Sequence, residues 1–221
     1  PIILHLDHGH DLKLIKKCIK SGYDSIMFDG SNLSFNKNIS LTKKVVKLAK
    51  KKNINVEAEL GALKEKKEYF TDPEQAKKFV DLTKIDSLAI SIGTVHGAYK
   101  GKAKLDFKRL EQISKKLKIP LVLHGASGVD RNIIKIANKY GAKLKYTRGI
   151  KDKDIKKAIK LGISKINIDT DLRLAFTSSL RSSLKKYPKD YDPRKFLELS
   201  RKEIEKIAIK KIKLFGSQNK A

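Results

Sequence analysis

The five histidines of this chain lie in three short segments, each of which follows a run of apolar residues. They are His5, His8 and His10 in H-L-D-H-G-H, His96 in S-I-G-T-V-H-G, and His124 in L-H-G-A-S-G. Three neutral imidazoles with a fourth position left open are a common ligand set for catalytic zinc. His8, His96 and His124 each precede a glycine, which lets a ligand approach the backbone closely. These three histidines are therefore predicted to converge on one metal ion.

Asp7 directly precedes His8. Adjacent residues of a strand point to opposite faces, so their side chains share a direction only where the strand ends and bends. A carboxylate beside a metal ligand can orient that ligand or transfer a proton. The spacing alone leaves both roles open for Asp7.

Glycine and hydroxyl residues gather at Gly97, at residues 125–128 and at residues 167–170. Backbone N–H groups at the starts of loops and helices bind anions. Parallel α/β barrels often bind phosphate after their last two strands, and the latter two segments lie at the ends of the last two expected strands. We therefore expect a phosphate cradle there.

Six short β-branched runs alternate with amphipathic helical segments, which predicts a parallel sheet with helical crossovers. The expected strands are 2–6, 25–28, 55–59, 87–92, 121–124 and 165–169, and a helix is expected at 196–215. Asp72 and Pro73 indicate a helix start, and Gly22, Gly141 and Gly162 indicate helix ends. A doubly wound sheet and a closed (β/α)8 barrel both fit, although no G-x-G-x-x-G follows the first strand.

Lysine is abundant, yet none lies in the polar strand endings. Imine chemistry would need a lysine there, activated by desolvation. Lys165 begins its expected strand and should face the opposite end of the sheet. The pattern favours metal chemistry over imine chemistry.

Composition narrows the class of protein. The chain has 221 residues, 40% of them hydrophobic, and a formal net charge of +27. A different class of function, a non-catalytic basic nucleic-acid-binding protein, would also explain this charge. The lysines are spread over nearly every helix and do not gather in one patch with interleaved aromatics, so we interpret them as a solvated surface. The single cysteine, Cys18, fits a buried position and a reducing cytoplasm. No signal peptide or membrane span is evident, and the start Pro-Ile-Ile predicts that the natural N-terminus lies upstream.

Several motifs in order resemble those of class II fructose-bisphosphate aldolases over nearly the whole chain. They are H-L-D-H-G, E-A-E-L-G, Y-F-T-D-P-E-Q-A, I-G-T-V-H-G-A-Y-K-G, L-V-L-H-G-A-S-G and N-I-D-T-D-L-R. The resemblance implies a (β/α)8 TIM barrel whose N-terminal strands are missing from this sequence. Residues 1–221 would then form a single barrel domain with six of the eight βα units, and a helical extension at about 188–221.

The resemblance also implies a function. The chain would be a zinc-dependent lyase of glycolysis and gluconeogenesis that reversibly cleaves fructose 1,6-bisphosphate to dihydroxyacetone phosphate and glyceraldehyde 3-phosphate. Tagatose 1,6-bisphosphate is the alternative substrate, but relatives specific for it tend to lack an acid at the position of Asp169. A homodimer or homotetramer is expected, without membrane or specific nucleic-acid partners, and with a monovalent cation near the phosphate as an optional addition.

Site residues carry over position by position. Asp7 would be the catalytic proton-transfer group, His8, His96 and His124 the zinc ligands, and Glu59 a ligand at a second metal position. Dihydroxyacetone phosphate would lie among Gly97, Gly125, Ser127, Asn167 and Thr170. Asp169 would contact a sugar hydroxyl, and Arg173 the distal phosphate across a subunit interface. Relatives carry a glycine-rich acidic loop after E-L-G, whereas here Gly61 is followed closely by a lysine-rich run. Either the loop is deleted or the sequence closes over a gap, so Glu65 and Glu68 receive no role.

Overall fold

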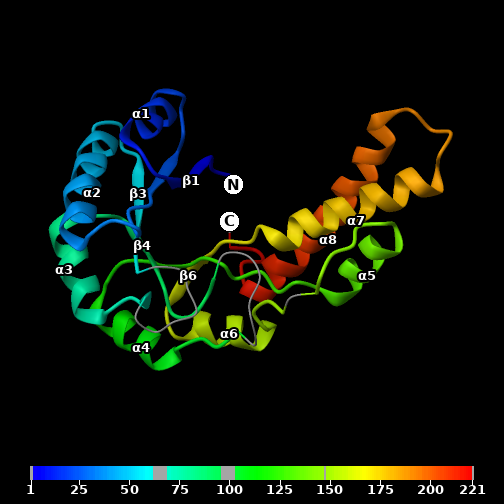
Figure 1. Ribbon diagram of the computed structural model, residues 1–221. Coiled ribbons are helices and arrows are strands. Elements are labelled where there is room, and N and C mark those ends of the chain that lie inside the picture. The colour runs from blue at the N-terminus through cyan, green and yellow to red at the C-terminus, as the bar shows by residue number, and fades with distance from the viewer. Residues whose placement is uncertain (1, 62–68, 96–102, 147, 221) are drawn as a thin grey trace. The chain divides into compact units, whose positions relative to one another are not determined.

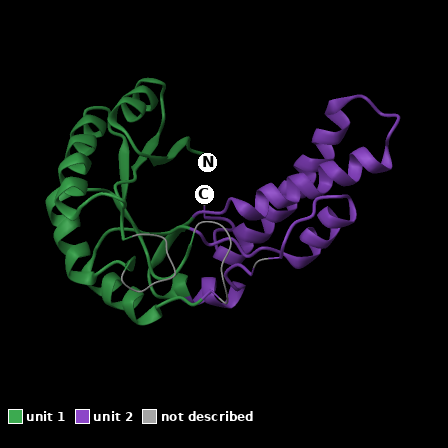
Figure 2. Cartoon of the chain, in the orientation of Figure 1, with its two compact units in different colours: residues 1–96, 104–124, 158–166 green, residues 97–103, 125–157, 167–221 purple. Residues whose placement is uncertain are grey.

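The structure is a computed structural model of the 221-residue chain, and it describes residues 2–61, 69–95, 103–146 and 148–220. The chain divides into two compact units (Figure 2). Unit 1 comprises Pro1–His96, Lys104–His124 and Ala158–Ile166, and unit 2 comprises Gly97–Ala103, Gly125–Lys157 and Asn167–Ala221. The expected single barrel domain with an extension from about residue 188 stays a prediction.

Unit 1 is built on one parallel sheet whose strands follow the chain order β1-β2-β3-β4-β5-β6. The strands are β1 (His5–Gly9), β2 (Ser25–Phe28), β3 (Asn55–Leu60), β4 (Ser87–Ile90), β5 (Leu121–Leu123) and β6 (Ile163–Ile166). Helices α1 (Leu12–Lys20), α2 (Phe35–Lys50), α3 (Pro73–Thr83) and α4 (Phe107–Lys116) lie side by side along the curled sheet (Figure 1). The expected α/β fold with a parallel sheet is confirmed.

Strands β2, β4 and β5 are largely apolar on both faces, as buried parallel strands should be, whereas β1, β3 and β6 also carry polar side chains. Ile26, Met27 and Phe28 of β2 have no exposed surface, and Met27 joins Ala89 and Val122 in one buried cluster. Helix α2, by contrast, is buried on one face only: Val45 and Val46 are buried, while its lysines face outward. Because successive side chains of a strand point to opposite faces of the sheet, the position of a residue in its strand determines which face its side chain lies on.

The helix signals in the sequence act as expected. Asp72 accepts hydrogen bonds from the backbone N–H groups of Glu74 and Gln75, at 3.0 and 2.9 Å, and Pro73 is the first residue of α3. Gly22 and Gly141 follow α1 and α5 (Arg131–Lys139) with φ of +83°. Both glycines adopt the left-handed conformation that ends a helix.

Of the six expected strands, only 25–28 has the predicted bounds; β3, β4 and β5 differ by one or two residues at their ends, and the two edge strands differ most. The strand expected at 2–6 begins only at His5 and continues to Gly9. The backbone oxygen of Leu4 still accepts from the N–H of Ser25 at 3.3 Å, but the N–H of Leu4 donates to a side chain, Asp24 Oδ2 at 2.6 Å, instead of to a neighbouring strand. The strand expected at 165–169 is β6, Ile163–Ile166, which starts directly after Gly162. It ends early because the backbone turns at Asp169 into α7 (Thr170–Lys186).

Unit 2 is mainly helical. The long helices α7 and α8 (Pro193–Phe215) pack along each other, and α5 packs on α7 (Figure 1). The helix expected at 196–215 begins earlier, because Asp192 accepts from the N–H of Arg194 at 3.0 Å and Pro193 takes the first helical position. α6 (Asp152–Lys160) runs from unit 2 into unit 1 along the chain.

Among the described residues, no helix is both long and apolar enough to span a membrane.

Candidate active site and metal centre

The end of β1 bends at the acid and histidine that the sequence singled out. His8 has φ of +51°, and the pairing of β1 with β2 shifts register between Leu6 and Gly9. This bend allows the adjacent side chains of Asp7 and His8 to point in a common direction, the condition stated for them from the sequence. Asp7 Oδ1 consequently lies 3.9 Å from His8 Nε2, and the Asp7 side chain is about half exposed.

His8 and His124 point at each other across the sheet. His8 Nε2 lies 3.0 Å from His124 Nδ1, and the two ring planes are nearly perpendicular, at 87°. Their other ring nitrogens face carboxylates: His8 Nδ1 is 2.8 Å from Asp29 Oδ2, and His124 Nε2 is 2.9 Å from Glu57 Oε1.

These carboxylates set which nitrogen of each ring carries hydrogen. An ionised carboxylate only accepts, so each histidine donates from the nitrogen that faces it. The two remaining nitrogens then direct their lone pairs at each other, an arrangement that a proton or metal ion between them would stabilise. Hydrogen bonding to Asp29 raises the pKa of His8. Burial raises the pKa of Asp29, but hydrogen bonds from His8 and Ser31 outweigh it and hold that pKa well below its usual range.

Glu59, the predicted ligand at a second metal position, lies beside the same pair. Its carboxyl is buried, and Oε2 is 3.9 Å from His8 Nδ1 and 3.8 Å from His124 Nδ1. Among the described residues this oxygen has no hydrogen-bond partner. Burial, with the nearby Asp29 charge, raises the pKa of Glu59 to about 8. A buried carboxyl oxygen left without a partner beside two imidazoles fits a cation.

Two overlapping sets of side chains could hold a metal ion. One is Asp7, His8 and His124, and the other is His8, Asp29 and Glu59; the ligand atoms of each set lie within 4.8 Å of one another. His96, the third predicted zinc ligand, and Gly97 lie outside the described residues, as do Glu65 and Glu68. The structure thus brings together Asp7, His8, His124 and Glu59 of the predicted set.

Sequence reasoning missed Asp29, although a signal was present. Asp29 directly follows β2 in F-D-G-S, at the same edge of the sheet as the histidines. The next residue, Gly30, lacks a side chain where Asn38 packs, and Asn38 Nδ2 donates to the backbone oxygen of Glu59 at 3.0 Å. Asn38 therefore packs against the chain just after β2, at Gly30, and hydrogen-bonds to β3, at Glu59, which links the ends of these two strands.

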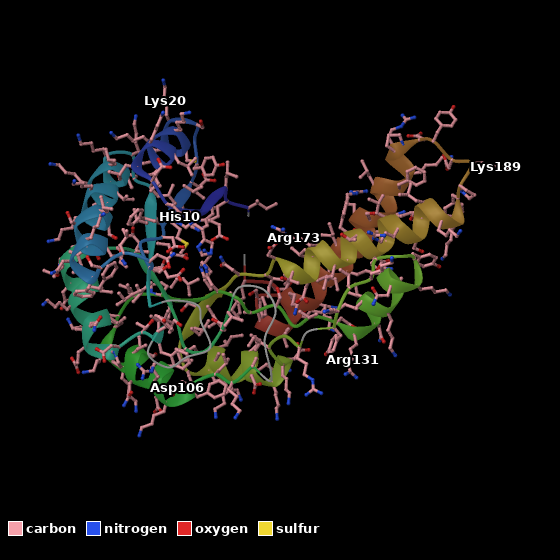
Figure 3. The ribbon with its side chains drawn as sticks, viewed as in Figure 1. His10, Lys20, Asp106, Arg131, Arg173 and Lys189 are labelled. Carbon is pink, nitrogen blue, oxygen red and sulfur yellow. The ribbon has the colours of Figure 1, made fainter. Side chains whose placement is uncertain are left out.

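The position predicted for Lys165 was wrong. Lys165 lies near the end of β6, and its Nζ is 2.6 Å from Glu57 Oε2 and 3.2 Å from His5 Nε2. Burial raises the pKa of Glu57, but hydrogen bonds from His124 and Lys165 outweigh this and lower it. Burial and the Lys165 charge lower the pKa of His5. His10, by contrast, is exposed beyond β1 (Figure 3).

The predicted phosphate-binding residues among those described lie in unit 2. Gly125 has φ of +62°, and the backbone oxygen of Ser127 accepts from the N–H of Ile150 at 3.0 Å. Thr170 is the first residue of α7 and Asn167 lies just before it. Arg173 Nε pairs with Asp169 Oδ1 at 2.7 Å on the exposed start of this helix (Figure 3).

The family model of class II fructose-bisphosphate aldolases matches residues 1–220 of this chain. The chain belongs to this family. It is 44% identical to the fructose-bisphosphate aldolase of Thermus caldophilus, covering all of this chain and 76% of the relative. It is 42% identical to the enzyme of the same name from Giardia intestinalis, covering all of this chain and 72% of that enzyme.

Solved structures of aldolases share the fold. The YdjI aldolase from Escherichia coli K12 superposes with a TM-score of 0.79 and 37% identity, covering all of this chain and 72% of that one. The fructose-bisphosphate aldolase of Campylobacter jejuni gives 0.77 and 25%, with the same coverage. The predicted class II aldolase, a carbon–carbon lyase, is confirmed. Class II aldolases depend on a metal ion, which agrees with the two ligand sets.

Proposed function

We propose that this aldolase reversibly cleaves fructose 1,6-bisphosphate to dihydroxyacetone phosphate and glyceraldehyde 3-phosphate, with a zinc ion held by His8, His96 and His124. The observation that carries the metal site is the 3.0 Å approach of His8 Nε2 and His124 Nδ1, each with its other nitrogen turned to a carboxylate. Two imidazole nitrogens with converging lone pairs suit zinc. The relatives named for fructose bisphosphate favour that substrate over tagatose bisphosphate.

The surrounding side chains fit a metal ion and its chemistry. A bound zinc ion supplies a Lewis acid that draws electron density from the substrate carbonyl. Asp29 and Glu57 fix the ring orientation of His8 and His124 by accepting their second N–H groups. Glu59 offers a ligand at a second position, because its Oε2 is buried and has no hydrogen-bond partner among the described residues.

Asp7 is the proposed proton-transfer group. Its carboxylate lies beside His8 and is about half exposed, so a substrate hydroxyl can reach it. In cleavage, Asp7 would accept the proton of the 4-hydroxyl as the C3–C4 bond breaks, and in condensation it would return that proton. A general base must lie within hydrogen-bond reach of the proton it takes, and the exposure of the Asp7 carboxylate allows a substrate hydroxyl to approach it that closely.

The remaining substrate contacts and the assembly extend this proposal. Dihydroxyacetone phosphate would bind among Gly97, Gly125, Ser127, Asn167 and Thr170, where backbone N–H groups and the start of α7 favour anions. Asp169 and Arg173, both well exposed, would read a hydroxyl and the distal phosphate. A monovalent cation near the phosphate is an optional addition.

We also infer that the six βα units belong to a (β/α)8 barrel, which the strictly consecutive order of parallel strands supports. A homodimer or homotetramer and a cytoplasmic location stay predictions from the family resemblance and from cysteine usage.

Bound metal and cleavage activity, measured together before and after a chelator, test this function. We expect about one zinc ion per site and loss of cleavage with its removal. His8→Ala should lose both metal and activity, whereas Asp7→Ala should keep the metal and lose most turnover. Tight zinc binding by His8→Ala would refute the ligand assignment, and faster cleavage of tagatose bisphosphate would refute the substrate.

A further inference from the structure

A chain of hydrogen bonds lies behind His124, on the side away from His8. Glu57 Oε1 is 2.9 Å from His124 Nε2, and Glu57 Oε2 is 2.6 Å from Lys165 Nζ. Lys165 Nζ is also 3.2 Å from His5 Nε2, and His5 Nδ1 is 2.6 Å from Ser25 Oγ. All five residues belong to unit 1, and they come from β1, β2, β3 and β6 and from the end of β5.

The donors and acceptors in this chain can be assigned from chemistry. An ammonium group only donates, so His5 Nε2 must accept from Lys165. The hydrogen of the His5 ring is then on Nδ1 and is donated to Ser25 Oγ. Glu57 accepts from Lys165 with one oxygen and from His124 with the other. Every link therefore favours the tautomer of His124 that carries its hydrogen on Nε2 and has a lone pair on Nδ1, the nitrogen that faces His8.

The surroundings explain why Glu57 needs a second partner. Its side chain is only 3% exposed, on the interior of β3, and a buried carboxylate is costly unless it is paired and hydrogen-bonded. With both oxygens bonded, its plane cannot rotate away from His124. Lys165, at 38% exposure, reaches the buried carboxylate from the more open side, and the neutral His5 ring limits where its ammonium group can lie.

We propose that Lys165 is a positioning residue, which holds Glu57 against His124 and thereby sets the affinity of the histidine site for its metal ion. Lys165 itself contacts neither metal nor substrate in this role. The inference deepens the proposed function and rests on its metal site. Partners one bond away from metal ligands typically change metal affinity 10- to 100-fold when they are removed. Lys165 acts one bond further out, so a loss of about tenfold is expected for Lys165→Met.

The experiment is a zinc dissociation constant measured by competition with a chromophoric chelator on the purified protein. Lys165→Met should weaken zinc binding about tenfold, while Lys165→Arg, which keeps the charge and donors, should stay within about threefold of the wild type. Lys160→Met is the matched control: Lys160 is exposed at the end of α6, just before the same strand, and the substitution should leave affinity unchanged. At saturating zinc, the KM of Lys165→Met for the sugar bisphosphate should match the wild type.

A double-variant cycle separates this role from general damage. If Lys165 acts through Glu57, then Lys165→Met should add little to the loss caused by Glu57→Gln. Lys165→Gln replaces the methionine variant if that variant does not fold. Unchanged zinc affinity in the Lys165 variants, or losses that simply add, would overturn the inference. Failure of the wild type to bind zinc would instead overturn the proposed metal site.

Discussion

Replacing Lys211 with methionine tests how firmly one ion pair holds residues 125–129 in unit 2. Lys211 Nζ, on α8, lies 2.7 Å from Asp171 Oδ2, and the two side chains are 12% and 5% exposed. Asp171 also accepts from the backbone N–H groups of Gly128 and Val129, at 2.9 and 2.7 Å. Methionine keeps much of the apolar stem of lysine and removes the charge.

The size of the effect follows from this burial. Removing one partner of a buried ion pair typically costs about 3–5 kcal/mol, because the other charge stays buried without compensation. Asp171 would keep two backbone donors, so the lower end, a loss of about 3 kcal/mol in the free energy of unfolding, is expected. Val129 has φ of +54°, unusual for a β-branched residue, and depends on the same carboxylate. Loosening it should also raise the KM for the sugar bisphosphate.

Urea unfolding followed by circular dichroism measures the loss, and the neighbouring Lys210→Met is the matched control. Lys210 Nζ lies 4.0 Å from Asp130 Oδ2, and these side chains are 57% and 39% exposed. An exposed pair of this kind contributes little, so the control should change the free energy of unfolding by less than about 1 kcal/mol. Equal losses in the two variants would refute the reasoning from burial.

Three further predictions concern the metal centre. Asp29→Asn should weaken zinc binding about 10- to 100-fold in a chelator competition, whereas substitution of the exposed His10 should not. Hydrogen bonding to Asp29 raises the pKa of His8, so a proton competes with zinc for His8 at a higher pH than for an ordinary histidine. As the pH falls, the zinc affinity of the wild type should therefore begin to decline at a higher pH than that of Asp29→Asn. Burial raises the pKa of Glu59 to about 8, so at pH 7 the metal-free protein holds a proton there. Zinc binding in weak buffer should then release about one proton more from the wild type than from Glu59→Gln, and equal release would contradict a role of Glu59 at the metal.

The sequence predicted the parallel sheet, and the position of His8 and His124 at one edge of it, because both depend on local patterns. Apolar runs with polar ends identify buried parallel strands, and the polar ends of such strands meet at one edge of the sheet. The side chains of Asp7 and His8 can share a direction only if the strand bends between them, and His8 provides this bend with φ of +51°. None of these steps required knowledge of which strands are neighbours.

The carboxylates behind the histidines could not be predicted in this way. Glu57 and His124 are 67 residues apart, and Glu57 and Lys165 are 108 apart, so no local pattern links them. An acidic residue in a strand has a predictable face, but its partner depends on the register between strands that are distant in the chain. Sequence alone therefore proposed candidate ligands by residue type and missed the carboxylates that hydrogen-bond to their second ring nitrogens.

The error at Lys165 shows how a small boundary shift changes a chemical conclusion. The strand expected at 165–169 lies at Ile163–Ile166, two residues earlier at its start. A shift by two keeps every side chain on its predicted face, because strand side chains alternate with a period of two. It does move Lys165 from the beginning of the strand to its functional end, beside Glu57. Metal chemistry is still preferred over imine chemistry, but for a different reason. The Lys165 ammonium group is hydrogen-bonded to Glu57 and His5, and Glu57 in turn hydrogen-bonds to His124.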